Sequence, residues 1–263
     1  MNMTKLITAG LTCALLSSCA PIKDPVVTPE DPKVYRVGSS VEVYLSTMDA
    51  SNLFNHMPED AIVYDKQAAP KTGFDVTIDP NETFQNILGA GASFTDSAAY
   101  LINSVLSPQQ RDDLMVKLFD KEYGIGLSFI RQPMGASDFA RDFYTYDDQA
   151  KGQTDEDLSD FSIDHDRTDI LPLLKQALRL NPDLKIMASP WSAPGWMKTS
   201  DNTVGGSLKP EYYEEYAQYF VKFIQAYQEE GIEIFAITPQ NEPLYIPKHY
   251  PGLGMSAYQQ VQF

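Results

Sequence analysis

Cysteine is nearly absent from this chain. The 263 residues include only Cys13 and Cys19, so neither a disulfide framework nor a thiolate metal site is expected in the rest of the chain. Histidine is scarce as well. His56, His165 and His249 are far apart in the sequence and form no pair at helical spacing, which argues against a zinc site.

Long apolar runs and excess positive charge are also missing. The amino-terminal apolar run, residues 6–16, is too short to span a bilayer. A formal net charge of -16 repels phosphate backbones and argues against nucleic-acid partners. No Gly-rich dinucleotide fingerprint, P-loop, internal repeat or G-x-S-x-G elbow is present. We therefore expect no cofactor, and the 43% hydrophobic content predicts a globular chain.

The first residues have the pattern of an export signal. Lys5 precedes the apolar run, and small residues (LSS) precede Cys19. We predict that residues 1–18 are a lipoprotein signal peptide, that Cys19 carries lipid, and that residues 19–34 form a Pro-rich tether. We expect the protein to be an exported bacterial lipoprotein that its lipid anchors to a membrane, at the cell surface or in the periplasm. The alternative is an ordinary secretory signal that is cleaved nearby.

Beyond the tether, the patterns predict two regions. Residues 35–80 contain short alternating runs, at 41–45 and 74–78, which predict a half-exposed antiparallel sheet in a side β-domain. From residue 81 to 263, strand and helix patterns alternate. The predicted strands cover residues 86–94, 127–134, 185–189 and 232–237, the last one buried on both faces. The predicted helices cover residues 108–121 and 170–180, and the stretch from Pro210 to Gly231.

This alternation predicts an α/β fold with a parallel sheet and helical crossovers. The first half of a TIM (β/α)8 barrel fits it best, and a doubly wound sheet is the alternative. In a barrel, the chemistry lies at the carboxyl ends of the strands.

Polar side chains follow each predicted strand. Asp96 follows the first strand, Arg131 lies in the second, Trp191 follows the third, and Asn241 and Glu242 follow the fourth. Hydrogen-bonding groups beside an indole ring are suited to holding a sugar by its hydroxyls and its CH surface. Each residue also has a structural alternative: Asp96 as a helix N-cap, Arg131 as the partner of a buried acid, and Trp191 as core.

Glu242 stands in the stretch TPQNEP, directly after an apolar strand. Cleavage of a glycosidic bond needs a carboxyl that protonates the leaving oxygen and a second carboxyl that attacks the sugar or activates water. Glu242 is the candidate proton donor, and partial burial or a neighbouring carboxylate would favour its protonated form. A polar turn is the alternative interpretation of this stretch.

Five blocks over residues 85–245 resemble glycoside hydrolase family 30, of the glucosylceramidase and endo-β-1,6-glucanase type. They are GAGASFTDSAA, FIRQPMGASDF, YTYDD, ASPWSAPGWMKT and TPQNEP, in this order. The resemblance implies a (β/α)8 barrel with an attached β-sandwich that hydrolyses β-glucosidic bonds with retention of configuration. It also implies residue roles: Glu242 as acid/base, Asp96 and Trp191 on the glucose hydroxyls, Asn241 on the 2-hydroxyl, and Arg131 orienting the carboxylates.

The resemblance places the nucleophile, a second glutamate, at the end of the seventh strand, whereas we predict only four barrel strands here. We therefore expect residues 81–263 to be a truncated barrel that does not hydrolyse glycosides alone. As substrate of the complete protein we favour β-1,6-glucan over glucosylceramide, because a bacterial surface lipoprotein meets extracellular glycans. Other β-glycosidase specificities stay open.

Two other functions were weighed. A non-catalytic carbohydrate-binding surface lipoprotein would account for a missing nucleophile. A metal-dependent function would start from the stretch Asp164-His165-Asp166, but this stretch lacks a second histidine at helical spacing. We expect His165 to lie in a solvated loop and expect no metal.

Overall fold

The computed structural model describes residues 43–57, 79 and 81–263. The predicted signal peptide, Cys19, the tether and the strand at 74–78 lie outside the described residues. The chain divides into two compact units, Met1–Gln85 and Asn86–Phe263. No helix within the described ranges combines the length and the apolar character needed to cross a membrane.

In the first unit, the described residues form one antiparallel strand pair. β1 (Tyr44–Leu45) pairs with β2 (Asn55–His56). The Tyr44 ring stacks on Phe54 with 4.9 Å between ring centroids. The β-sandwich implied by the family resemblance stays a prediction.

The second unit is built on a four-stranded parallel sheet with the order β3-β4-β5-β6. The strands are β3 (Gly91–Ser93), β4 (Phe129–Met134), β5 (Lys185–Pro190) and β6 (Ala236–Ile237). The order in space follows the order in the chain, as in a (β/α) barrel. A doubly wound sheet would instead reverse its order at a switch point. The predicted parallel sheet with crossover helices is therefore confirmed.

The two edge strands are shorter and more exposed than we expected. β3 covers only Gly91–Ser93 of the predicted range 86–94, and all its residues are exposed. The prediction that residues 232–237 are buried on both faces is wrong, because Phe235 and Ile237 are 47% and 43% exposed. Each edge strand has a single neighbour in the described sheet. A Cβ atom on Gly91 would lie 1.4 Å from the Phe129 carbonyl oxygen, so only glycine fits there.

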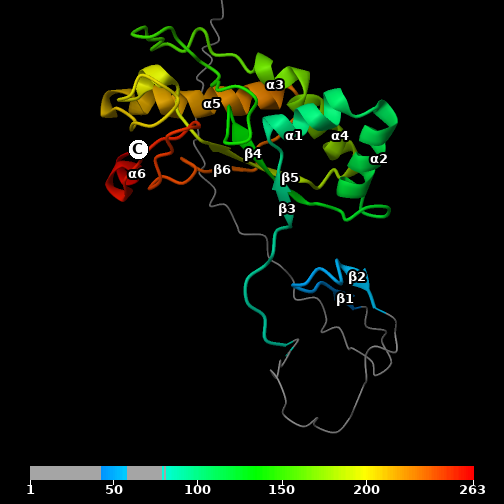
Figure 1. Ribbon diagram of the computed structural model, residues 1–263. Coiled ribbons are helices and arrows are strands. Elements are labelled where there is room, and N and C mark those ends of the chain that lie inside the picture. Colours follow the sequence, from blue (N-terminus) through cyan, green and yellow to red (C-terminus); the bar gives the residue numbers. More distant parts are fainter. Residues whose placement is uncertain (1–42, 58–78, 80) are drawn as a thin grey trace, which may run out of the picture. The chain divides into compact units, whose positions relative to one another are not determined.

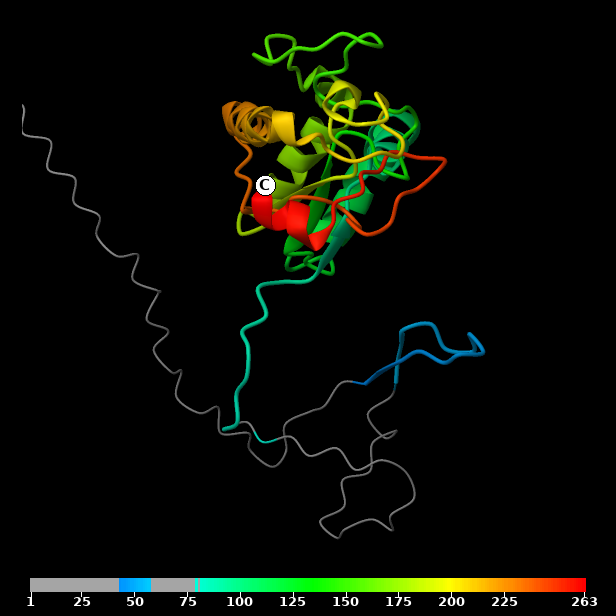
Figure 2. The same cartoon turned by 90° about the vertical axis from the view of Figure 1, so that its left-hand side faces the viewer.

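Helices fill the connections between the strands, and Figure 1 shows α1 to α5 gathered on one side of the sheet. Figure 2 shows the same unit from the side, with α6 below α5. The α-helices are α1 (Asp96–Tyr100), α2 (Pro108–Phe119), α3 (Asp164–Thr168), α4 (Ile170–Leu180), α5 (Tyr213–Glu229) and α6 (Ala257–Gln262). Shorter turns are the π-helix η2 (Leu101–Val105) and the 3-10 helices η3 (Gly195–Met197) and η4 (Pro210–Tyr212).

Local signals account for where these helices begin and end. Ser107 caps α2, and Ser107 and Gln110 form the predicted capping box. The third predicted helix begins as η4 at Pro210 and continues as α5, and Gly231 follows it at φ +77°. The apolar faces of α4 and α5 pack into the core. The helical predictions are confirmed to within a few residues.

Three tyrosine hydroxyls converge on the buried carboxylate of Asp166 in α3. Tyr144 donates at 3.1 Å, Tyr146 at 2.7 Å and Tyr227 at 2.6 Å. Burial raises the pKa of Asp166, and these hydrogen bonds oppose the rise. His165, also in α3, stacks on the Tyr144 ring with 3.6 Å between centroids. The expectation of a solvated loop at His165 is therefore wrong.

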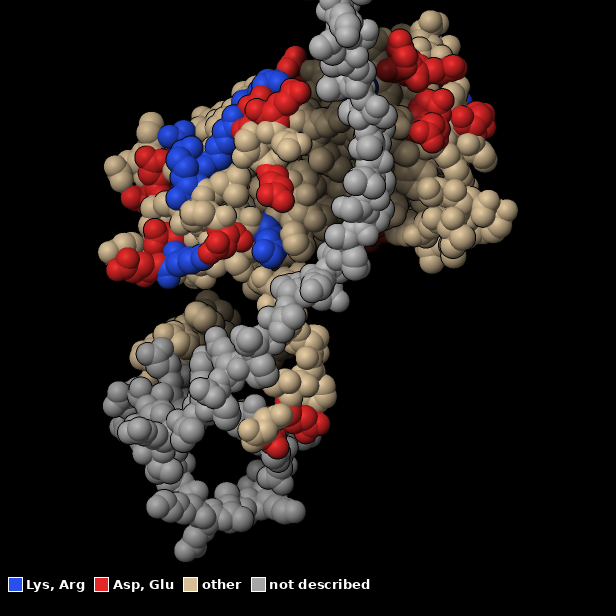
Figure 3. Space-filling view, turned by 180° about the vertical axis from the view of Figure 1, so that it is seen from behind, with Lys and Arg blue, Asp and Glu red and all other residues tan. Residues whose placement is uncertain are grey.

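The surface charge of the described residues is mixed. Figure 3 shows Lys and Arg side chains lying beside Asp and Glu side chains on the face opposite that of Figure 1. Ion pairs such as Lys175–Glu230 and Lys121–Asp183 join charges on different segments. Such interspersed charge on this face is typical of a solvated surface.

Candidate active site

Arg131 links three strand ends on the carboxyl side of the sheet. From β4, its Nη2 donates to Ser189 Oγ on β5 at 3.0 Å and to Asn241 Oδ1 after β6 at 2.7 Å. Its guanidinium also lies over the Trp191 ring, 4.5 Å from the centroid. A planar guanidinium can make all of these contacts at once. The structure therefore brings Arg131, Trp191 and Asn241 together at one edge of the sheet.

Trp191 and Asn241 are held by their backbones as well. Gln240 Nε2 donates to the Trp191 carbonyl at 2.7 Å and to the Asn241 carbonyl at 2.9 Å. The Asn241 N–H donates to Pro190 at 2.9 Å. Trp191 is only 6% exposed, and Arg131 covers one face of its ring. Because Arg131 occupies the Asn241 oxygen, the Nδ2 group of Asn241 is the donor left for a ligand.

Glu242 lies in a tight turn directly after Asn241. Its side chain is exposed, and its φ of +44° is unusual for a residue other than glycine. The Tyr245 N–H closes the turn by donating to the Glu242 carbonyl at 2.8 Å. The partial burial expected of a proton donor is absent in this structure. A bound substrate would have to exclude water from this carboxyl.

A second carboxylate, Asp138, shares the surroundings of Glu242. Burial lowers the pKa of Arg131, and the charges of Asp138 and Glu242 oppose this change. Burial raises the pKa of Tyr250, and Tyr245, Glu242 and Asp138 add to the rise. Asp138 is exposed and belongs to the loop that follows β4. Asp138 is not among the site residues predicted from the sequence, although GASDF comes directly after the strand.

Asp96 has different surroundings. It is 4% exposed and forms an ion pair with Arg141 at 2.9 Å, while His165 Nε2 lies 3.0 Å from the same oxygen. Burial acts to raise its pKa, but the hydrogen bonds from Arg141 and His165 prevail and lower it to about 2. Thr95, and not Asp96, caps α1. These contacts occupy both carboxylate oxygens, and the substrate role of Asp96 stays a prediction.

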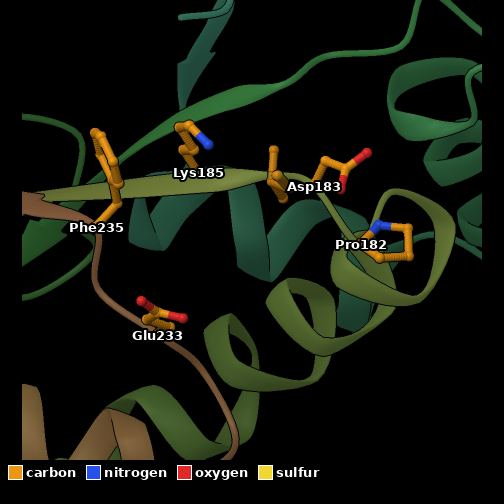
Figure 4. Close-up of a pocket in the computed structure, with 6 residues that line it drawn as sticks. Pro182, Asp183, Lys185, Glu233 and Phe235 are labelled. Atoms are coloured by element: carbon orange, nitrogen blue, oxygen red, sulfur yellow. The ribbon is translucent and has the colours of Figure 1, made fainter. Parts of the chain in front are cut away.

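The described residues contain no cluster of three His, Cys, Asp or Glu side chains arranged for a metal ion. A shallow pocket, shown in Figure 4, lies at the amino end of β5. Its volume is about 260 Å³, and it is lined by Pro182, Asp183, Leu184, Lys185, Glu233 and Phe235. Because Trp191 follows the other end of β5, this pocket is separate from the cluster around Arg131.

The model of the glycosyl hydrolase family 30 TIM-barrel domain matches residues 87–257 of this chain. The chain belongs to this family. The matched range includes Asp96, Arg131, Trp191, Asn241 and Glu242. The fold inferred from the sequence resemblance is thereby confirmed for the barrel part.

Two named proteins are similar to this chain over most of the matched range. "Putative glucosylceramidase 4" of Caenorhabditis elegans is 40% identical over 175 residues, which are 64% of this chain and 33% of the relative. "Endo-1,6-beta-D-glucanase neg1" of Aspergillus fumigatus is 40% identical over 194 residues, which are 68% of this chain and 39% of the relative. The chain therefore spans between a third and two fifths of the length of these relatives.

A solved structure has the same arrangement. The endo-β1,6-glucanase BT3312 superposes with a TM-score of 0.69 at 32% sequence identity, covering 83% of this chain and 47% of that one. The observed parallel sheet is thus part of a family 30 α/β barrel. The family is one of glycoside hydrolases.

Proposed function

We propose that this chain carries the acid/base half of the active site of a retaining β-glycoside hydrolase. The observation that supports this best is the cluster around Arg131, which brings Trp191 and Asn241 together beside Glu242 at the carboxyl edge of the sheet. An indole, an amide and two exposed carboxylates are the groups that bind a sugar and protonate its leaving oxygen.

In the proposed mechanism, protonated Glu242 gives its proton to the glycosidic oxygen while the bond from this oxygen to the anomeric carbon breaks. A second carboxylate attacks the anomeric carbon and forms a glycosyl ester. Glu242, now ionised, then takes a proton from the water that hydrolyses this ester. We expect this second carboxylate to be a glutamate on a later strand, as the resemblance to the family implies.

As substrate we propose a β-1,6-linked glucan. The names of a 40% identical relative and of the solved structure, both endo-1,6-glucanases, support this choice. The name of a glucosylceramidase relative supports a glucosyl lipid as the runner-up. Both substrates place a β-linked glucose in the site, and they differ in the leaving group.

One observation favours a second function, non-catalytic carbohydrate binding. Glu242 is exposed, so it lacks the partial burial that we expect of a proton donor. A surface protein that only binds glycans would need the cluster around Arg131 but no proton transfer.

The test compares Glu242→Gln with Glu229→Gln, a change of the same kind at an exposed position in α5. It uses a protein that contains this chain and hydrolyses β-glucosides. We expect Glu242→Gln to lower kcat on β-1,6-glucan by about 10² to 10⁴-fold. On a dinitrophenyl β-glucoside, whose leaving group needs no protonation, the first step should change little. Equal losses on both substrates would contradict the acid/base role.

A further inference from the structure

Lys198 is a fully buried lysine that has no acidic partner among the described residues. The residue comes directly after η3. Its Nζ donates to Ser192 Oγ at 2.7 Å, to the Thr203 carbonyl at 2.6 Å and to the Gly252 carbonyl at 2.9 Å. All of these acceptors are neutral. Buried lysines are rare unless they are paired, so this one needs an explanation beyond packing.

The contacts of Lys198 join two segments that are distant in the chain. Ser192 and Thr203 belong to the connection after β5, whereas Gly252 belongs to the segment after Glu242. The Gly252 N–H also donates to the Thr203 carbonyl at 3.1 Å, and the Gly254 N–H donates to Gly206 at 2.9 Å. Lys198 thus lies at the centre of the junction that fastens residues 252–255 to residues 199–207. We call this junction the Lys198 clamp.

The Lys198 clamp continues to Glu242 through a short path. The Met255 N–H donates to the Pro243 carbonyl at 2.7 Å, next to Glu242. The positive φ of Glu242 is a costly conformation that persists only when the surroundings hold it. The turn is held on its other side by the hydrogen bond from Asn241 to Pro190.

We propose that Lys198 is a positioning residue for Glu242, which acts by fastening residues 252–255 so that Met255 holds the Glu242 turn in place. An ammonium group has three N–H donors and meets three acceptors here. A guanidinium is planar and larger, and a methionine has the length without the donors. The catalytic part of this inference rests on the proposed function of Glu242, whereas the structural part does not.

The structural part is tested by amide hydrogen exchange on the chain itself. Lys198→Met leaves the Gly252 carbonyl without its lysine partner, so the protection of the Gly252, Gly254 and Met255 amides should fall about tenfold or more. The amides of α4 should stay unchanged. The control is Lys209→Met, because Lys209 donates to the Trp196 carbonyl and not to residues 252–255. Equal protection in both variants would overturn the proposal.

The unchanged protein gives a second measurement, which decides the matter if Lys198→Met does not fold. Burial lowers the pKa of Lys198 to about 7. The neutral amine keeps two N–H donors for the Thr203 and Gly252 carbonyls and can accept from the Ser192 hydroxyl, so the clamp stays closed above pH 7. Opening the clamp returns the amine to water and to its ordinary pKa, so opening binds a proton. Protection of the same amides should therefore rise from about pH 7 to pH 9, by at most about tenfold per unit. Protection factors without this rise would overturn the proposal.

The other titratable groups on the packed segments are Asp201, Lys248, His249 and Tyr250. The Asp201 carboxylate accepts the Gly152 N–H at 3.0 Å. Tyr250 lies beside Tyr245, Glu242 and Asp138, and its pKa is raised above the ordinary value. Tyr250 therefore stays protonated through this pH range. A rise in exchange protection that is confined to the amides of residues 252–255 is therefore assigned to the deprotonation of Lys198.

The positioning role is tested by kinetics in a protein that contains this chain and hydrolyses glucosides. Lys198→Met should lower kcat on β-1,6-glucan, leave KM nearly unchanged, and have little effect on the first step with the dinitrophenyl β-glucoside, the step that forms the glycosyl ester. Equal losses in the first step on both substrates, or a change in KM alone, would overturn this role. Failure of the proposed function looks different, because Glu242→Gln then slows the first step equally on both substrates and amide exchange alone decides the inference.

Discussion

Arg131 and Asn241 are 110 positions apart in the chain, yet Arg131 Nη2 donates to Asn241 Oδ1 at 2.7 Å. The same guanidinium lies over the Trp191 ring. A single side chain on β4 therefore sets the orientation of the amide and the indole that are proposed to contact sugar. The arrangement depends on the shape of the guanidinium as much as on its charge.

Arg131→Lys tests this dependence. Lysine keeps the charge, but it cannot bond Ser189 and Asn241 and cover Trp191 at the same time. We expect binding of a β-1,6-linked glucose disaccharide, measured by calorimetry, to weaken at least about tenfold. Arg111→Lys on the half-exposed surface of α2 is the control and should bind normally. Equal affinity in both variants would contradict a positioning role for Arg131.

Asp138→Asn tests which of the two candidate aspartates, Asp138 or Asp96, binds the sugar. Asp138 is exposed beside Arg131 and Glu242, so losing its charge should weaken sugar binding while thermal stability changes little. Asp142→Asn, at an exposed position in the same connection, is the control and should bind as the unchanged chain does. Undiminished affinity of Asp138→Asn would remove Asp138 from the proposed site.

Asp96→Asn should act mainly on stability. The change removes the shorter of the two ion pairs that Arg141 makes with buried carboxylates, so the free energy of unfolding should fall by about 2 kcal/mol at pH 7. The pKa of Asp96 is about 2 in the folded state, below its ordinary value of 3.8. This contribution is therefore present above about pH 4 and is lost as the pH falls through about 2. Urea unfolding at pH 7 and at pH 3 measures the difference, which should shrink at the lower pH.

Asp147→Asn should have the opposite effect. Asp147 is 2% exposed, and its Oδ2 has no partner among the described residues. Burial raises its pKa from 3.8 to about 6, and Asp155 adds to the rise. Its contribution to stability is present below about pH 4 and is lost as the pH rises through 6. The variant should be more stable by about 1–2 kcal/mol at pH 7.5 and similar at pH 4.

Thermal unfolding at the two pH values measures the effect of Asp147→Asn. The control is again Asp142→Asn, which should show the same stability as the unchanged chain at both pH values. A destabilised Asp147→Asn at pH 7.5 would mean that Asp147 is ionised and paired in the folded chain.

The regular elements and the gathering of the site residues followed from local patterns. The Ser107 capping box and the apolar periodicity of α4 and α5 gave the helices to within a few residues. Because the carboxyl ends of parallel strands meet at one edge, the strand pattern alone brought Arg131, Trp191 and Asn241 together.

Features that depend on partners distant in the chain could not be predicted from the sequence. The ion pair between Asp96 and Arg141 spans 45 positions, and no local signal links an acid in α1 to an arginine in a loop. The same limit explains His165, whose partner ring belongs to Tyr144. Burial of β6 was overestimated because an apolar run does not reveal whether a strand has one neighbour or two. Asp138 was missed because only the residues at the strand end itself were considered.

The three phenols around Asp166 make the long connection after β4 dependent on α5. Tyr144 and Tyr146 come from that connection, and Tyr227 comes from α5. Removing one hydroxyl, as in Tyr227→Phe, leaves the buried acid with fewer donors and so weakens the hold on the other two rings. The connection and the helix are thus expected to unfold as one cooperative unit, because the single carboxylate of Asp166 accepts hydrogen bonds from both.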